Sequence, residues 1–332
     1  MTSRDIVLKT LQGEKAPVPW VEIETRDELI ALTLGIEKVT WKERVEYALK
    51  AGQDAVGFAH WERFGCDVIS KGQVLGFNAR INDWADLEDK FLMPDKLDEE
   101  KLIANVKEAH EAIGDSGLAL FVAHVLCLDP IMMDLGFENM CYKLHDDVDL
   151  IKNMLERYVG YYSKLDELYS KMPEIDFIWV GEDIAYNTGT YVRPKVFREL
   201  FLPYFKRITD NIKKPWIYHS DGNILPVLDD LLTLGMDAIH PLQPGAMDIY
   251  EVKKTYGSKV TLVGSVDLTT LTDGTEEDVV NEVNHLMDAC SIGGRYMLSS
   301  SNSLACYLNP NNVLAMGKAK QEWNKRNGFG LR

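Results

Sequence analysis

Short apolar runs rich in β-branched residues recur along the whole chain, and most are followed by a segment whose apolar positions have helical spacing. Eight of these runs predict β-strands: Val18–Ile23, Asp54–Ala59, Leu118–Val125, Phe177–Glu182, Pro215–Ser220, Ala238–Leu242, Val260–Val266 and Arg295–Ser300. Regular alternation of strands and helices is typical of a parallel sheet. The pattern therefore predicts an α/β fold, a (β/α)₈ TIM barrel.

The segments between the predicted strands add detail to this barrel. Arg193–Lys214 carries one apolar face and predicts a long helix, which Pro203 should kink. Shorter helices are predicted at Ile224–Leu234 and Ile249–Tyr256. About sixty residues separate the second and third strands, so extra helices are expected in the N-terminal half. No Gly/Ser-rich or Pro-rich linker divides the chain, which predicts a single domain over residues 1–332.

The charge balance excludes several kinds of partner. The 332 residues include 36 Lys and Arg against 52 Asp and Glu, a formal net charge of −16. Such a chain lacks the basic surface that nucleic acid or an anionic membrane requires. Five cysteines without a Cys-x-x-Cys pair, and an N-terminus without the apolar core of a signal peptide, predict a cytoplasmic protein. The oligomeric state stays open, a homodimer included.

In a TIM barrel the chemistry sits at the C-terminal ends of the strands. The predicted ends are rich in reactive side chains: Glu22, Glu24, His60, His124, Glu182, Asp183, His219, Asp221, His240, Gln243 and Asn302. Because His219 and Asp221 are two residues apart at one strand end, their side chains should point the same way, into the barrel mouth.

A metal site is one interpretation of these residues. His219 with two carboxylates, or with the Glu182 carboxylate and the Cys306 thiolate, would form a zinc site with an open position for substrate. The alternatives are that His219 only hydrogen-bonds a neighbouring carboxylate, and that Cys306 is a small buried apolar residue.

For other residues, too, a functional and a structural role are both compatible with the sequence. Glu182 is a candidate general acid, because apolar walls would raise its pKa, whereas Asp183 could equally be solvated or ion-paired. An aromatic and methionine cluster either lines a pocket for a planar substrate or belongs to the core: Trp61, Phe64, Phe77, Met132, Met133 and Phe137. The chain has no phosphate-binding loop and no dinucleotide fingerprint.

Four segments of the chain resemble the uroporphyrinogen decarboxylase superfamily: Thr2–Glu14, Arg193–Tyr204, His219-Ser220-Asp221-Gly222-Asn223-Ile224 and Leu298–Met316. The resemblance runs nearly end to end and implies the same barrel fold. It also implies one of two chemistries, which are decarboxylation of a porphyrinogen and methyl transfer to or from a corrinoid protein.

The decarboxylase chemistry fits the charges poorly. The resemblance implies an Arg-x-x-Gly-Arg-Tyr segment after the first strand, which would hold a multiply charged substrate. This chain has Glu22-Ile23-Glu24-Thr25-Arg26-Asp27 there, and with Glu182, Asp183 and Asp221 it should make the barrel mouth acidic. Carboxylates would repel the carboxylates of the substrate.

The methyltransferases of this superfamily that act on thiols carry His-x-Cys after the fifth strand and a second Cys after the eighth. Here Asp221 replaces the first Cys, and the second position falls near Asn302, with Cys306 a few residues later. Oxygen ligands suit a thiolate substrate less well than sulfur ligands do, which favours a methyl group bound to oxygen.

The chain therefore resembles most the methyltransferase components of anaerobic O-demethylases. These move the methyl group of an aryl methyl ether, such as vanillate, veratrole or guaiacol, to the Co(I) corrinoid of a separate protein. The resemblance implies a corrinoid protein as partner, a small-molecule methyl donor, and Zn²⁺ as a second cofactor. The expected catalytic residues are Glu182, His219 and Asp221; the expected substrate-binding residues are Glu22, His60, His124, Asp183, Gln243 and Asn302; the expected metal ligands are Glu182, His219 and Cys306.

Two other functions remain open on the sequence. One is decarboxylation of a smaller aromatic or tetrapyrrolic acid by the same barrel. The other is a non-catalytic corrinoid- or tetrapyrrole-binding protein, because a shared fold does not fix function.

Overall fold

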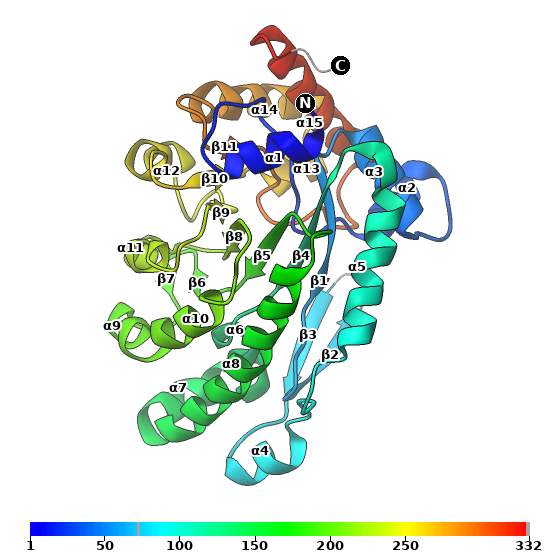
Figure 1. Ribbon diagram of the computed structural model, residues 1–332. Helices are drawn as coiled ribbons and strands as arrows, with labels where there is room; N and C mark the ends of the chain where they lie inside the picture. Colours follow the sequence, from blue (N-terminus) through cyan, green and yellow to red (C-terminus); the bar gives the residue numbers. More distant parts are fainter. Residues whose placement is uncertain (72–73, 330–332) are drawn as a thin grey trace.

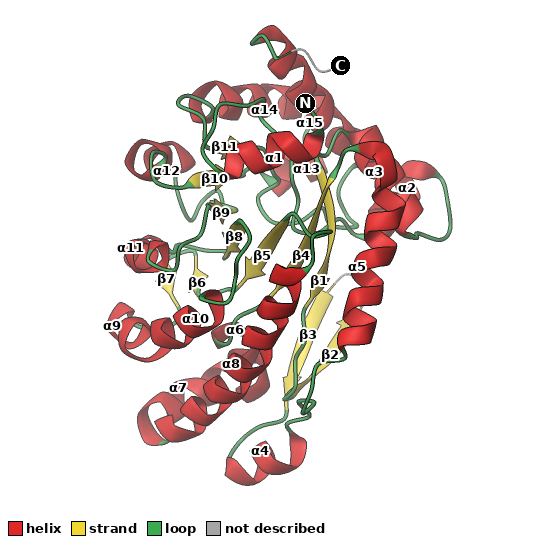
Figure 2. Cartoon of the chain, viewed as in Figure 1, coloured by secondary structure: helices red, strands yellow, loops and turns green. Residues whose placement is uncertain are grey.

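A computed structural model describes residues 1–71 and 74–329, and at its centre lies a curled parallel sheet surrounded by helices (Figures 1 and 2). Seven strands follow one another in the order β1-β4-β5-β8-β9-β10-β11. Their bounds are β1 Ala55–His60, β4 Ala119–His124, β5 Phe177–Gly181, β8 Trp216–His219, β9 Ala238–His240, β10 Thr261–Val263 and β11 Tyr296–Met297. The sheet confirms the α/β, TIM-barrel class predicted from the sequence.

The first predicted strand closes the barrel without forming a regular strand. The Val21 N–H donates to the Leu298 carbonyl at 3.1 Å, and the Leu298 N–H donates to Pro19 at 2.9 Å. On the other side, the Asp54 N–H donates to the Trp20 carbonyl at 2.8 Å. Residues 18–23 thus join the edge beyond β11 to the edge before β1. The prediction of a full strand at Val18–Ile23 is corrected to a backbone bridge.

Alternation along each strand divides the core into two parts. In β5, Phe177 and Trp179 belong to a buried cluster inside the barrel, whereas Ile178 and Val180 belong to the larger core between sheet and helices. Successive side chains of a strand point to opposite faces, so a strand that is buried on both sides becomes a continuous apolar run. This burial explains why the strands were visible in the sequence.

Helices cover the outside of the barrel and lie between successive strands. The helices of eight residues or more are α1 Ser3–Leu11, α2 Asp27–Leu34, α3 Trp41–Ala51, α5 Glu99–Ile113, α6 Leu128–Leu135, α7 Phe137–Asp146, α8 Val148–Lys171, α10 Leu202–Thr209, α12 Ile249–Tyr256, α14 Glu276–Cys290 and α15 Pro310–Arg326. Shorter ones are α4 Trp84–Lys90, α9 Pro194–Val196, α11 Leu228–Leu232 and α13 Leu268–Asp273. No helix in the described part of the chain is long and apolar enough to cross a membrane.

The helix predicted at Arg193–Lys214 is divided. A π-helical turn, Phe197–Phe201, separates α9 from α10, and the Leu202 N–H reaches back to the Phe197 carbonyl. Pro203 lies in the first turn of α10, where its missing N–H costs no hydrogen bond. The predicted helix is therefore interrupted by a π-helical turn just before Pro203, and α10 ends at Thr209, earlier than predicted.

The helix predicted at Ile224–Leu234 is also shorter, because a 3₁₀ turn, Leu225–Val227, precedes α11. The helix predicted at Ile249–Tyr256 is confirmed by α12.

The long insertion after β1 contains the expected extra helices α4 and α5, and also an antiparallel hairpin that was not predicted. Its strands are β2 Cys66–Lys71 and β3 Val74–Ala79. The hairpin projects beyond the barrel, with α4 at its far end (Figure 1). Val68, Ile69 and Phe77 of this hairpin are exposed, so its described side chains do not show the buried alternation that predicts a strand.

Candidate active site

A cavity of about 360 Å³ opens at the C-terminal ends of the strands. Its walls are formed by Ile23, Glu24, Arg26, Trp61, Arg63, Val68, Phe77, Val125, Asp129, Met133, Gly181, Asp183, His219, Asn302 and Ser303. Trp61, Phe77 and Met133 of the predicted aromatic cluster thus line the cavity. Phe64 is buried in the core instead, and Phe137 is exposed elsewhere. The volume lies in the range of about 300–1,000 Å³ that is typical of small-molecule sites.

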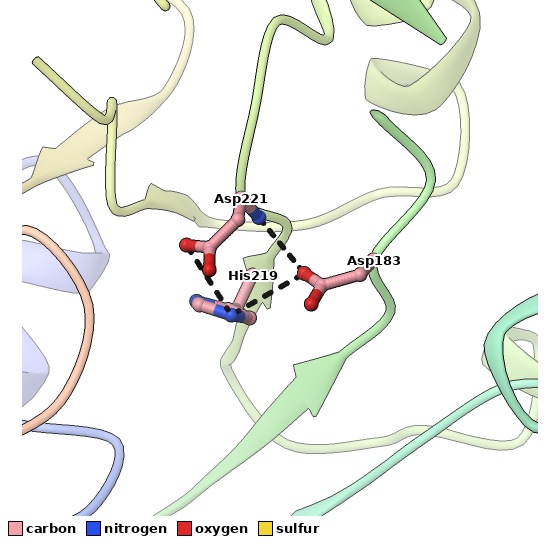
Figure 3. Close-up of side chains that lie close together, drawn as sticks. All are labelled: Asp183, His219 and Asp221. Carbon is pink, nitrogen blue, oxygen red and sulfur yellow. Dashed lines mark hydrogen bonds and ion pairs between the residues drawn. The ribbon is translucent and has the colours of Figure 1, made fainter. Parts of the chain in front are cut away.

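Three potential ligands lie close together: Asp183, His219 and Asp221 (Figure 3). Asp183 and His219 line the cavity, and Asp221 lies beside them. One ligand atom from each lies within 4.8 Å of the other two. His219 Nε2 is 3.6 Å from Asp183 Oδ1 and 3.9 Å from Asp221 Oδ1. β8 ends at His219, so Asp221 lies beyond the strand, but the two side chains do come together as predicted.

Two glycines allow these side chains to meet. A Cβ on Gly181, at the end of β5, would lie 2.8 Å from the Trp61 ring, so glycine is needed for Trp61 to reach the cavity wall. Gly222 has a φ of +80°, and a Cβ there would lie 2.5 Å from the Ala185 carbonyl oxygen. The loop after β8 can therefore approach the loop after β5, which brings Asp221 towards Asp183.

The Asp221 carboxylate is held in place on one side only. Its Oδ2 accepts a hydrogen bond from the Asn302 amide, while its Oδ1 is buried without a hydrogen-bond partner. Burial is the main cause that raises the pKa of Asp221 to about 6; His219 lowers it, and the nearby Asp183 carboxylate raises it. The Asp221 N–H donates to Asp183 Oδ1 at 2.9 Å. An unsatisfied carboxylate oxygen beside a second carboxylate favours a cation or a proton.

Glu182 lies away from this group. Its Oε1 accepts hydrogen bonds from the N–H groups of Cys127, Leu128 and Asp129, and its Oε2 accepts one from Leu126. The carboxylate therefore caps the N-terminus of α6, which begins at Leu128. Burial raises its pKa to about 7. The expectation that Glu182 is a metal ligand is corrected, because its oxygens are already engaged inside the wall.

Cys306 is not a member of the converging group either. Its side chain is half-buried, and among the described residues the set that could hold a metal ion is Asp183, His219 and Asp221. The predicted ligand set of Glu182, His219 and Cys306 is thus replaced by one that keeps only His219. None of the five cysteines forms a disulfide in the described structure.

Behind His219 lies a chain of hydrogen-bonded, buried polar side chains that was not predicted from the sequence. His219 Nδ1 is 2.7 Å from His240 Nδ1, and His240 Nε2 is 3.1 Å from Ser299 Oγ. Ser299 Oγ in turn donates to Glu22 Oε2 at 3.2 Å. Burial, and then His219, hold the pKa of His240 well below its ordinary value, so the imidazole is neutral.

Glu22 is buried in the barrel wall and does not reach the cavity, where it was expected to bind substrate. Its carboxylate accepts hydrogen bonds from Trp20 Nε1, from both the N–H and the hydroxyl of Ser300, and from Ser299. Burial raises its pKa to about 7 against these hydrogen bonds.

The two remaining histidines predicted to bind substrate are also engaged elsewhere. His60 Nε2 is 3.0 Å from the Tyr161 hydroxyl. His124 is fully buried, and its Nε2 lies 2.8 Å from an Asp166 oxygen. Burial lowers the pKa of His124, but the Asp166 carboxylate outweighs this effect and the net shift is upward. Neither histidine lines the cavity.

Gln243 has an indirect place at the site. Its Oε1 accepts the Gly222 N–H at 2.9 Å, so it holds the loop that carries Asp221. Asn302, by contrast, lines the cavity as expected and contacts Asp221 directly.

The charges around the cavity are more balanced than the sequence suggested. Arg26 Nη1 is 3.2 Å from Glu24, and Arg63 Nη2 is 2.8 Å from Asp129. The Arg63–Asp129 pair is almost wholly buried, with side-chain exposures of 8% and 7%. Arginines do reach the mouth, each beside a carboxylate, which corrects the expectation of a purely acidic mouth. Arg63 was missed because it lies outside any predicted strand end.

Comparisons with known proteins agree with this architecture. The family model described as uroporphyrinogen decarboxylase (URO-D) matches residues 176–323. A search of curated proteins gives no match. Among solved structures, a methyltransferase from Methanosarcina mazei is similar with 17% identity and a TM-score of 0.79, over 97% of this chain and 99% of that chain. A B12-independent methionine synthase from Shewanella sp. W3-18-1 in complex with selenomethionine is similar with 13% identity and a TM-score of 0.54, over 93% of this chain and 96% of that chain. At these identities the likeness shows a common fold.

Proposed function

We propose that the chain is an enzyme of the uroporphyrinogen decarboxylase superfamily that transfers a methyl group. The family match over residues 176–323 and the likeness to the Methanosarcina mazei methyltransferase over nearly the full length of both chains support this class. The observation that carries the proposal is the convergence of Asp183, His219 and Asp221, of which Asp183 and His219 line a largely apolar cavity.

The three residues fit a divalent cation such as Zn²⁺. They offer one imidazole nitrogen and two carboxylate oxygens, and the buried Asp221 Oδ1 has no other partner. Three protein ligands and an open fourth position are typical of catalytic zinc sites. A bound Zn²⁺ would supply a Lewis acid that stabilises negative charge developing on an oxygen of the substrate.

The cavity fits an uncharged aromatic substrate, and we propose an aryl methyl ether. Trp61 and Phe77 provide aromatic walls, and Met133 adds a polarizable one. Among the described residues that line the cavity, the cations are Arg26 and Arg63, and each is paired with a carboxylate, which disfavours a multiply charged substrate. The ether oxygen would lie towards His219 and Asp183, with the aromatic ring against Trp61.

The reaction we propose is a displacement at the methyl carbon. The bond from the methyl carbon to the ether oxygen breaks, its electron pair stays on the oxygen as a phenolate, and the methyl cation equivalent passes to Co(I) of a corrinoid on a partner protein. Cobalt supplies the electron pair of the new bond and becomes methyl-Co(III). The chain itself needs no nucleophile. Its residues hold the ring, orient the oxygen and present Asp183 and Asp221 to the cation, while Asn302 fixes Asp221.

The experiment that tests this function mixes the protein with Zn²⁺, a corrinoid reduced to Co(I), and a panel of methoxyarenes. Loss of the Co(I) absorbance and growth of methyl-Co(III) absorbance are expected with at least one methoxyarene, and Asp183→Asn should abolish them. Equal spectra with and without the protein for methoxyarenes, methylamines and thiols would refute methyl transfer to a corrinoid.

A second candidate is decarboxylation of a small aromatic acid, and Arg26 is the observation in its favour. Its side chain is 40% exposed at the cavity and could leave Glu24 to hold a carboxylate. Substrate-dependent release of CO₂ without any corrinoid, lost in Arg26→Gln, would favour this function over methyl transfer.

A further inference from the structure

Four buried residues form a continuous polar chain from the barrel wall to the candidate site. It runs from Glu22 through Ser299 and His240 to His219, with contacts of 3.2, 3.1 and 2.7 Å. Glu22, Ser299 and His240 are at most 3% exposed, and His219 is 9% exposed. The members come from four separate parts of the barrel: the bridging segment 18–23, the chain after β11, the end of β9 and the end of β8. The two middle members, Ser299 and His240, are at most 1% exposed.

The donors and acceptors along the chain have one consistent order when Glu22 is ionised. Ser299 has a single hydroxyl hydrogen and donates it to Glu22. The Ser299 oxygen must then accept the hydrogen bond from His240 Nε2–H. His240 is 1% exposed and its side-chain partners are an imidazole and a hydroxyl, so a charge on its ring would be buried without a counter-charge, and the ring is neutral with one N–H. His240 Nδ1 is therefore an acceptor, and the hydrogen between the two Nδ1 atoms belongs to His219.

This order of donors and acceptors also determines the state of the other ring nitrogen of His219, Nε2. With its hydrogen on Nδ1, His219 presents the lone pair of Nε2 to Asp183 and Asp221. In the opposite tautomer, Nε2 would carry a hydrogen and could not bind a cation. A histidine that ligates a metal usually has its other ring nitrogen fixed by a hydrogen bond, which sets both the tautomer and the ring orientation.

We propose that Glu22, Ser299 and His240 are positioning residues that hold His219 as the Nδ1–H tautomer, so that Nε2 is ready to accept a metal ion. The proposal rests on the metal site of the proposed function, but the tautomer is a property of the protein without metal. The metal site and the tautomer can therefore be refuted by separate measurements.

The chain offers a matched pair of variants. Ser299→Ala removes the hydroxyl that connects Glu22 to His240. Ser300→Ala removes a hydroxyl that donates to the same Glu22 oxygen at 2.7 Å but has no hydrogen bond to His240. Both changes are small and lie next to each other in the barrel wall, so effects on folding should be similar.

The first measurement is the ¹⁵N chemical shift of the histidine rings in metal-free protein labelled with [¹⁵N]histidine, at pH 8. His219→Gln and His240→Gln spectra would assign the signals. We expect a pyrrole-type Nδ1 and a pyridine-type Nε2 for His219, and the reverse for His240. Ser299→Ala should shift His219 towards a tautomer average, whereas Ser300→Ala should keep the wild-type pattern. An Nε2–H tautomer of His219 in the wild type would overturn the proposal, and so would identical patterns in Ser299→Ala and wild type.

The second measurement is the affinity for Zn²⁺, determined by competition with a chromophoric chelator. Loss of a residue that orients a ligand typically lowers metal affinity by about 10- to 100-fold. We expect a loss of at least about 10-fold in Ser299→Ala and of less than about 3-fold in Ser300→Ala. Equal losses in the two variants would mean that only the environment of Glu22 matters, and would overturn the positioning role. If wild type binds no Zn²⁺, the metal site of the proposed function fails, and the NMR result alone decides the tautomer.

Discussion

Glu182 and Asp183 are neighbours in sequence, yet the structure gives them opposite roles, and Glu182→Ala tests this division. Glu182 accepts four backbone hydrogen bonds of 2.6–3.2 Å at the start of α6. Asp183 lines the cavity and has a side chain that is 37% exposed. Asp183→Ala is therefore the matched control.

The expected magnitude follows from the four N–H groups. A buried donor left without a partner costs about 1–3 kcal/mol, so four would cost about 4–12 kcal/mol if all remained dry. Water entering the space left by the side chain would satisfy some of them. We therefore expect Glu182→Ala to lower the free energy of unfolding by about 4 kcal/mol. Asp183→Ala should lower it by less than about 1 kcal/mol, because the site is partly exposed.

Urea unfolding followed by circular dichroism measures the stability, and Zn²⁺ competition measures the site. Glu182→Ala should keep Zn²⁺ affinity within about 3-fold of wild type, whereas Asp183→Ala should lower it by more than about 100-fold, as expected for loss of a direct ligand. A Glu182→Ala protein as stable as wild type but unable to bind Zn²⁺ would refute the capping role and return Glu182 to the ligand set.

Three further results are expected. Lys320→Met should lower the free energy of unfolding in urea by about 3–5 kcal/mol, because it leaves the Asp54 carboxylate, 2.6 Å away and 8% exposed, as an unpaired buried charge. The control, Lys318→Met on the exposed face of α15, should lower it by less than about 0.5 kcal/mol. Equal losses in the two variants would contradict the reasoning. Because the folded-state pKa of Glu22 is raised from 4.5 to about 7, the folded protein holds this proton more tightly, so stability should fall by about 3 kcal/mol as pH rises from about 4.5 to 7; a wild-type curve that runs parallel to that of Glu22→Gln would contradict it. Gly181→Ala should push the Trp61 ring from the cavity wall and weaken binding of a methoxyarene by about 10-fold or more in calorimetry, and unchanged affinity would place the arene elsewhere.

The sequence predicted the barrel because its strands are buried on both faces, so that each appears as an apolar run between polar ends. The hairpin β2–β3 was not predicted, because Val68, Ile69 and Phe77 are exposed and bury no common face. Strand-end positions were likewise visible in the sequence, which is why His219 and Asp221 could be placed together.

The direction in which a side chain points after a strand ends could not be predicted from the sequence. Glu182 and Asp183 follow the same strand, but Glu182 turns towards backbone N–H groups more than fifty residues earlier in the chain, and only the folded structure shows that α6 begins there. The contact of His240 with Ser299 spans 59 residues, and that of Ser299 with Glu22 spans 277. No local pattern encodes contacts across such separations.

The pairing of residues 18–23 with Leu298, which closes the barrel, has a consequence for protein synthesis. Residues 18–23 leave the ribosome long before Leu298, whose backbone groups pair with Pro19 and Val21. Val18 and Asn324 exchange two hydrogen bonds of 2.9 Å across a separation of 306 residues. The edge of residues 18–23 that faces away from β1 therefore stays open in a growing chain until Leu298 has been made, and pairing over such distances is slow. Until then this edge can pair with a strand of another chain.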